Sequence, residues 1–302
     1  MNNEPIDIVI PWLNPTEKWF ENYKLYCENE SPARIRDLNT IRPCIKSIIK
    51  NLPWIRYIWL IVQDEEQIPF DWEELKNEKI KFIFHKDIIP EKFLPTFNSI
   101  HIAVYTHNIK DLSEQFIWSN DDIIFKNFIP QEFFFNNGKS VHRENKLSIW
   151  KDLHCNTYAE ILNSTARFIE FLSGKRIIAN DNHIAIPIKK SLIEFIYTRW
   201  KEKIENDYKD SKIRKGKNIN TIETAFTIEE IYNKCEYGLA NQIKYGVLHL
   251  SDLTSKRKIE QIISDNDIIC INDSEELVKT WKEKADWIKE LFTNALDDSN
   301  VN

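Results

Sequence analysis

Three polar residues that could do chemistry follow a short apolar run. Residues 116–118 are typical of a buried strand, and Asn120, Asp121 and Asp122 come just after it. In open parallel sheets, ligands bind at the carboxyl ends of the strands. Paired aspartates there suit a divalent cation, and a cation suits a phosphorylated substrate. Asn and Asp also favour simple turns, so the motif by itself indicates either a site or a turn.

The composition is that of a folded protein with its own core. The 302 residues are 42% hydrophobic and 29% charged, which excludes a disordered chain. The formal net charge of −6 argues against a nucleic-acid partner. The sequence has five glycines and contains neither a P-loop nor a G-x-G-x-x-G fingerprint, so any phosphate must be bound in another way.

Cysteine spacing and hydropathy predict the compartment. The five cysteines are widely spaced and form no C-x-x-C pair, which favours reduced thiols in a cytosolic protein. The N-terminal residues lack the basic region and the long apolar run of a signal peptide. The longest apolar stretch, near residues 55–62, is too short to cross a bilayer. We therefore expect a protein that is cytoplasmic or peripheral at the inner face of the membrane.

Apolar patterns predict an α/β fold with a mostly parallel, Rossmann-like sheet flanked by helices. The expected strands are 6–10, 57–62, 80–85 and 115–118, and the expected helices among them are 41–52 and 98–109. We expect three parts: an α/β core over 1–130, a more helical substrate-binding part over 131–273, and an amphipathic helix over 274–302.

The later part of the chain is more helical and more charged. Helices are expected over 157–172 and 191–204, and the charged stretch 201–218 is either a solvated loop or a basic flap over an anionic ligand. Residues 274–296 have an apolar face that suits packing on the core, with a peripheral membrane role as the alternative.

Four blocks of the sequence, in this order, resemble the Stealth family of sugar-1-phosphate transferases. That family includes bacterial capsular polysaccharide phosphotransferases and the lysosomal-enzyme N-acetylglucosamine-1-phosphotransferase. The blocks are 6–14, then 36–122 with its Leu-Pro-Thr-Phe-Asn-Ser and Trp-Ser-Asn-Asp-Asp segments, then His183 with Pro187, Lys189 and Arg214, and finally 269–273. The chain departs from the family at Lys46, Ala103 and Ala185, where Arg, Glu and Pro are usual.

The resemblance implies a glycosyltransferase-A-like sheet and a reaction. A hexose-1-phosphate, for instance N-acetylhexosamine-1-phosphate, moves from a UDP-sugar to a hydroxyl of an acceptor glycan, which can be lipid-linked. UMP leaves and a phosphodiester remains. Phosphoryl transfer depends on charge neutralisation and positioning, so Mg²⁺ or Mn²⁺ is the expected cofactor.

Five residues receive roles in this reaction. Of Asp121 and Asp122, one would hold the metal or a metal-bound water, and the other would orient or deprotonate the acceptor hydroxyl. Asn120 would donate to a phosphate oxygen or cap the turn. His183 is the candidate general base or phosphate donor. Arg214 would neutralise developing negative charge, with Lys212 or Lys215 as the alternatives.

Four residues in the first two blocks could bind the donor. Asp7, within the first strand, would contact the nucleotide or the metal, or else be a buried partner of Arg36. Asn14 would touch the uridine or a phosphate, or form a turn. Arg36 would bind the diphosphate and Asp37 the metal, unless the two form a surface pair.

Four more residues combine binding with capping. Asn98 and Ser99 begin a helix, so they would cap it, bind phosphate at its N-terminus, or both. Asn272 would contact the sugar and Asp273 the metal, or both would form a turn before the last helix.

Two other functions are also compatible with the sequence. A metal-dependent glycosyltransferase would share the sheet and the nucleotide sugar but release UDP. A non-catalytic glycan-binding protein would explain the many aromatic residues, and neither nucleotide sugar nor metal would then raise its melting temperature.

Overall fold

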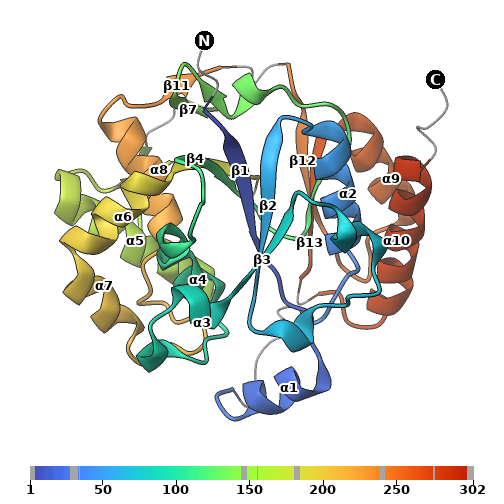
Figure 1. Cartoon of the computed structure of the whole chain (residues 1–302), viewed down its shortest axis with the longest axis horizontal. Coiled ribbons are helices and arrows are strands. Elements are labelled where there is room, and N and C mark those ends of the chain that lie inside the picture. Colours follow the sequence, from blue (N-terminus) through green and yellow to red (C-terminus); the bar gives the residue numbers. More distant parts are fainter. Residues whose placement is uncertain are drawn as a thin grey trace.

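A computed structural model gives the fold and describes residues 4–27, 33, 35–143, 148–154, 156–179, 184–238, 242–274 and 276–297. Figure 1 shows a central sheet with helices on both sides. The sheet has the strand order β10-β4-β1-β2-β3, with β1 to β4 parallel and β10 antiparallel to β4. The strands are β1 (Ile6–Pro11), β2 (Ile55–Val62), β3 (Ile80–Phe84), β4 (Gln115–Trp118) and β10 (Ile186–Lys189). The predicted mostly parallel, Rossmann-like α/β sheet is confirmed.

Alternate residues of the strands cover opposite faces of this sheet. Ile8 and Ile117 pack against α2, which spans Ile41–Asn51. Val9 and Phe116 pack against the helical layer on the other face. That layer consists of α4 (Ser99–Val104), α5 (Thr157–Ser173), α6 (Lys190–Arg199), α7 (Lys201–Tyr208) and α8 (Thr221–Ile231).

Two predictions for this layer need correction. The predicted helix 191–204 is two helices, because Trp200 leaves the helical conformation (φ −125°, ψ 30°) where its ring packs edge-on against Phe168. The predicted loop 201–218 is wrong for its first eight residues, which form α7 with Ile204 and Tyr208 buried.

A second sheet stands beside the central one. Its order is β12-β13-β5, with β12 (Tyr245–His249) parallel to β13 (Ile268–Asn272) and β5 (Ile123–Phe125) antiparallel to β13. Helices α9 (Lys256–Asp265) and α10 (Trp281–Asp297) cover it. Because β5 follows β4 and β10 returns to the central sheet, the expected boundary at residue 130 does not separate the two sheets.

The last helix begins later than expected. The prediction starts it at residue 274, whereas α10 starts at Trp281. The carboxylate of Asp252 accepts hydrogen bonds from the backbone N–H groups of residues 278–280, which holds this segment in a turn before the helix. No helix in the described ranges is both long enough and apolar enough to cross a bilayer.

Short elements complete the chain. The helices are α1 (Glu17–Lys24) and α3 (His85–Ile88), and the strands are β6 (Phe135–Asn136), β7 (Lys139–His142), β8 (Ser148–Ile149), β9 (Ile177–Ile178) and β11 (Glu236–Tyr237). The 3-10 turns are Glu65–Gln67, Glu73–Lys76, Glu91–Phe93, Thr106–Asn108 and Gln131–Phe133. The predicted helix 98–109 is therefore α4 followed by one of these turns.

Candidate active site

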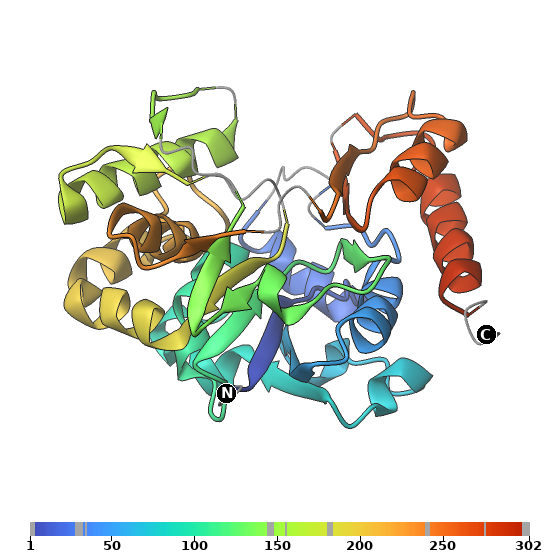
Figure 2. The same cartoon turned by 90° about the horizontal axis from the view of Figure 1, so that it is seen from above.

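A cleft of about 900 Å³ lies where the carboxyl ends of β1 and β4 meet the second sheet. Figure 2 shows the layer of α5 to α8 on one side and the layer of α9 and α10 on the other. The predicted site residues that line the cleft are Arg36, Asp37, Ser99, Asn120, Asp121, Asp122, Arg214, Asn272 and Asp273. Residues that lie far apart in the sequence therefore share one site.

The turn that carries the two aspartates joins the two sheets. Ser119 N–H donates to the carbonyl of Val9 in the central sheet (2.9 Å), and Ile271 N–H donates to the carbonyl of Asp122 from the second sheet (2.9 Å). The Cys270 thiol also donates to Oδ2 of Asp122, at 3.5 Å. Since both sheets bind this turn, Asp121 and Asp122 are held in place at the floor of the cleft.

Carboxylates in the cleft repel one another. Burial raises the pKa of Asp121 well above its usual range, and the charges of Asp122 and Asp37 raise it further. Burial also raises the pKa of Asp37, although its Oδ1 accepts a hydrogen bond from Asn39 N–H at 2.7 Å. A cation between these groups would relieve the repulsion.

The donors in the cleft suit a hard cation. Among the described residues, no three His, Cys, Asp or Glu side chains are already grouped as a metal site. Mg²⁺ is commonly bound by one or two carboxylates, with substrate phosphates and water completing its shell. Asp121 and Asp122 provide such a pair, so the residues fit a metal that binds together with a diphosphate.

We expect Asp121→Asn to stabilise the metal-free protein, with a gain that grows with pH. A carboxyl whose pKa is raised by folding binds its proton more tightly in the folded state. The wild type therefore loses stability as the pH rises from the unfolded value, about 3.9, through the raised folded value, and asparagine removes that loss. Thermal melts with a chelator at about pH 5 and about pH 8 test this. Equal melting temperatures of the two proteins at the higher pH would contradict the raised pKa.

Arg36 and Asp273 form a pair on the second-sheet side of the cleft. The guanidinium contacts both carboxylate oxygens of Asp273 and donates to the carbonyl of Ser274 at 3.0 Å. The alternative that Arg36 pairs with Asp37 on the surface is therefore wrong. Asn272 lies beside this pair, and its side-chain nitrogen is 2.9 Å from Nδ1 of His249.

Ser99 and Arg214 face the cleft from the helical side. A terminal nitrogen of Arg214 donates to Oγ of Ser99. Of the three cations considered for this role, Arg214 lines the cleft, whereas Lys212 donates to the carbonyl of Leu94 at 2.9 Å. The structure thus brings the predicted arginine to the site.

Asn98 supports this side without lining the cleft. Its Oδ1 accepts from His101 N–H and caps α4, as one alternative predicted. Its Nδ2 donates to the carbonyls of Ser211 and Ile213 and to Oδ1 of Asn218. Asn98 therefore fixes the loop that carries Arg214, and the structure does not support direct binding of a phosphate by its side chain.

Asp7 and Asn14 lie outside the cleft. The buried carboxylate of Asp7 accepts from Arg56 (2.9 and 2.6 Å), Trp59 Nε1 (2.9 Å) and Ser113 N–H (2.9 Å). Its partner is thus Arg56 and not Arg36, and these bonds leave it a role in the sheet rather than at a nucleotide or metal. Asn14 exchanges hydrogen bonds with Gln67, 53 positions away, and these bonds hold the loop after β1.

Sequence reasoning missed Glu223, a buried carboxylate of the cleft. Glu223, on the first turn of α8, lines the cleft and is only 3% exposed. The pattern of Asn220 followed three residues later by Glu indicates a helix start, but it gives no sign of a cleft. His183 lies outside the described residues.

Comparisons with known proteins agree with the resemblance. Residues 34–143 match the family described as Stealth protein CR2, conserved region 2. The chain is 30% identical over 295 residues to the capsular polysaccharide phosphotransferase fcs1 of Haemophilus influenzae, covering 89% of this chain and 78% of that protein. It is 30% identical to the capsular polysaccharide phosphotransferase cps1A of Actinobacillus pleuropneumoniae, covering 71% and 62%.

Two further matches are weaker. The exopolysaccharide phosphotransferase cps2G of Lactiplantibacillus plantarum is 28% identical and covers 72% of this chain and 73% of its own length. The solved structure of mouse xyloside xylosyltransferase 1 in its apo form covers 89% of this chain and 98% of its own, with 11% identity and a TM-score of 0.40. A TM-score this low carries no argument about activity.

Proposed function

The chain belongs to the Stealth family, and from this premise we propose that it transfers a hexose-1-phosphate from a UDP-sugar to a hydroxyl of an acceptor glycan. The similarity to these phosphotransferases confirms the predicted family and the predicted phosphotransferase class. In this proposal the sugar is an N-acetylhexosamine, and the acceptor belongs to a capsular or cell-surface polysaccharide. A lipid-linked acceptor would be met at the inner face of the membrane.

The charged groups around the cleft support the proposal. The cleft places carboxylates on its floor and an arginine on each side, Arg36 from the second-sheet side and Arg214 from the helical side. A diphosphate needs cations around its oxygens, and the reaction itself needs charge neutralisation more than covalent help. A cleft of this composition therefore suits a nucleotide diphosphate donor.

The proposed reaction replaces one phosphorus–oxygen bond with another. An acceptor hydroxyl oxygen attacks the β-phosphorus, a new O–P bond forms, and the bond from that phosphorus to the bridging oxygen breaks. UMP leaves with the bridging oxygen, and the anomeric bond of the sugar stays intact. Asp122 or His183 takes the hydroxyl proton. A bound Mg²⁺ or Mn²⁺, held by Asp121 and Asp122, would neutralise pyrophosphate oxygens.

The nucleotide that is released tests the proposal. Purified protein is incubated with UDP-N-acetylhexosamines, Mg²⁺ and a cell-surface glycan acceptor, and the products are separated by chromatography. We expect UMP that depends on both the acceptor and the metal. Acceptor-dependent UDP would instead identify a glycosyltransferase, and release of neither nucleotide would contradict the donor, the acceptor class or catalysis.

A further inference from the structure

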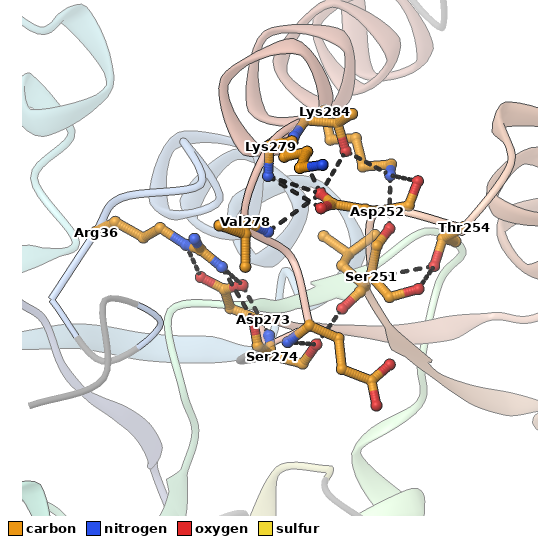
Figure 3. Close-up of polar contacts among 12 residues, drawn as sticks. Arg36, Ser251, Asp252, Thr254, Asp273, Ser274, Val278, Lys279 and Lys284 are labelled. Carbon is orange, nitrogen blue, oxygen red and sulfur yellow. Dashed lines mark hydrogen bonds and ion pairs between the residues drawn. The ribbon is translucent and has the colours of Figure 1, made fainter.

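We propose that Asp273 is a positioning residue, which holds Arg36 at the cleft to bind a diphosphate, and that it does not ligate the metal. This inference deepens the proposed function, because the diphosphate is taken to be that of the donor. It also extends to Asp252 and Lys284, which fix the segment that carries Asp273. Figure 3 shows these residues and their contacts.

Arg36 and Asp273 are joined by a bidentate contact. Nε and one terminal nitrogen of Arg36 meet the two carboxylate oxygens in a fork, and the side chains are only 9% and 11% exposed. Oδ1 of Asp273 also accepts from the N–H of Ser274 at 2.7 Å. Such bidentate pairs fix orientation as well as charge. Both carboxylate oxygens of Asp273 therefore accept hydrogen bonds from Arg36 or from the adjacent backbone.

The segment that carries Arg36 is positioned by the C-terminal layer. Residues 36–39 form neither helix nor strand, so contacts with other parts of the chain must place them. Leu38 is buried in the core between the second sheet and α10, where it packs with Leu277 and Ile288. The guanidinium of Arg36 lies 5.8 Å from the centre of the Trp281 ring. The C-terminal layer thus places Arg36 beside the cleft.

Hydrogen bonds to the loop after β12 fix the C-terminal layer beside Asp273. The carboxylate of Asp252 accepts from the N–H groups of Val278 (3.1 Å), Lys279 (2.9 Å) and Thr280 (3.0 Å). These bonds, those from Thr280 and Lys279 most of all, lower the pKa of Asp252 to about 2, so the carboxylate stays charged. Ser274 Oγ donates to the carbonyl of Leu250.

A buried lysine adds further hydrogen bonds between these segments. Nζ of Lys284 donates to the carbonyls of Ser251 (2.6 Å) and Asp252 (3.1 Å) and to Oγ1 of Thr280 (2.9 Å). It ties the first turn of α10 to the loop after β12. The junction between β13 and α10 is thereby held at several points. Asp273, which begins this junction, is presented to Arg36 at a fixed place.

The test measures the binding of inorganic pyrophosphate by calorimetry at a fixed Mg²⁺ concentration. A separate titration gives the Mg²⁺ concentration at which binding is half-saturated. We expect Arg36→Ala and Asp273→Asn each to weaken pyrophosphate binding roughly tenfold, and the double variant to lose little more. Asp252→Asn should give a smaller loss in the same direction. Asp286→Asn, an exposed change of the same charge on α10, is the matched control and should bind like wild type.

The Mg²⁺ titration separates positioning from ligation. In Asp273→Asn, half-saturation by Mg²⁺ should stay within about twofold of wild type, because no ligand is lost. A large rise in the Mg²⁺ requirement, or losses that add in the double variant, would overturn the inference. So would wild-type affinity in Asp273→Asn or an absence of pyrophosphate binding by wild type. If the protein passes this test but releases UDP, the inference about Asp273 stands and the proposed function is wrong.

Discussion

Asp122→Asn is expected to lower turnover about a hundredfold or more while the protein stays folded. The substitution removes a full negative charge from the floor of the cleft, where the acceptor hydroxyl and the metal are proposed to meet. It keeps the size of the side chain and an oxygen that can accept from the Cys270 thiol, which now donates to Asp122 at 3.5 Å. The expected loss is therefore chemical and not structural.

The measurement is the initial rate of acceptor-dependent UMP release at a series of Mg²⁺ concentrations that extends well above saturation of the wild type, together with a thermal melt of each variant. Asp286→Asn again serves as the control for a change of charge elsewhere. Wild-type turnover in folded Asp122→Asn would remove Asp122 from the reaction. A rate that recovers fully at high Mg²⁺ would leave it a role in metal binding alone.

Local sequence patterns predicted the sheet and the position of the aspartates. Runs of β-branched residues such as 6–10 fill both faces of a buried strand, so their secondary structure depends little on residues that are distant in the sequence. The polar residues after β4 reach the cleft because parallel strands end at one edge. Both inferences need only hydrophobic periodicity and the geometry of a parallel sheet.

Partners across long sequence distances could not be predicted in this way. Arg36 pairs with Asp273, which lies 237 positions away, and Asp7 pairs with Arg56 rather than Arg36. A buried carboxylate requires a donor, but nothing in its local sequence says which arginine will reach it. The start of α10 was missed for the same reason, since Asp252 comes from another loop.

Arg214→Ala is the second change with a large expected effect, a fall in turnover of about a hundredfold. Arg214→Lys should recover part of the rate, because lysine keeps the positive charge but lacks the planar guanidinium group that can donate to two phosphate oxygens at once. Arg257→Ala, which removes an exposed arginine on α9, away from the cleft, is the matched control and should turn over like wild type. Rates of UMP release and melting temperatures are compared across the three variants. Turnover in Arg214→Ala within a few-fold of wild type would show that another cation, such as Lys215, serves the phosphate.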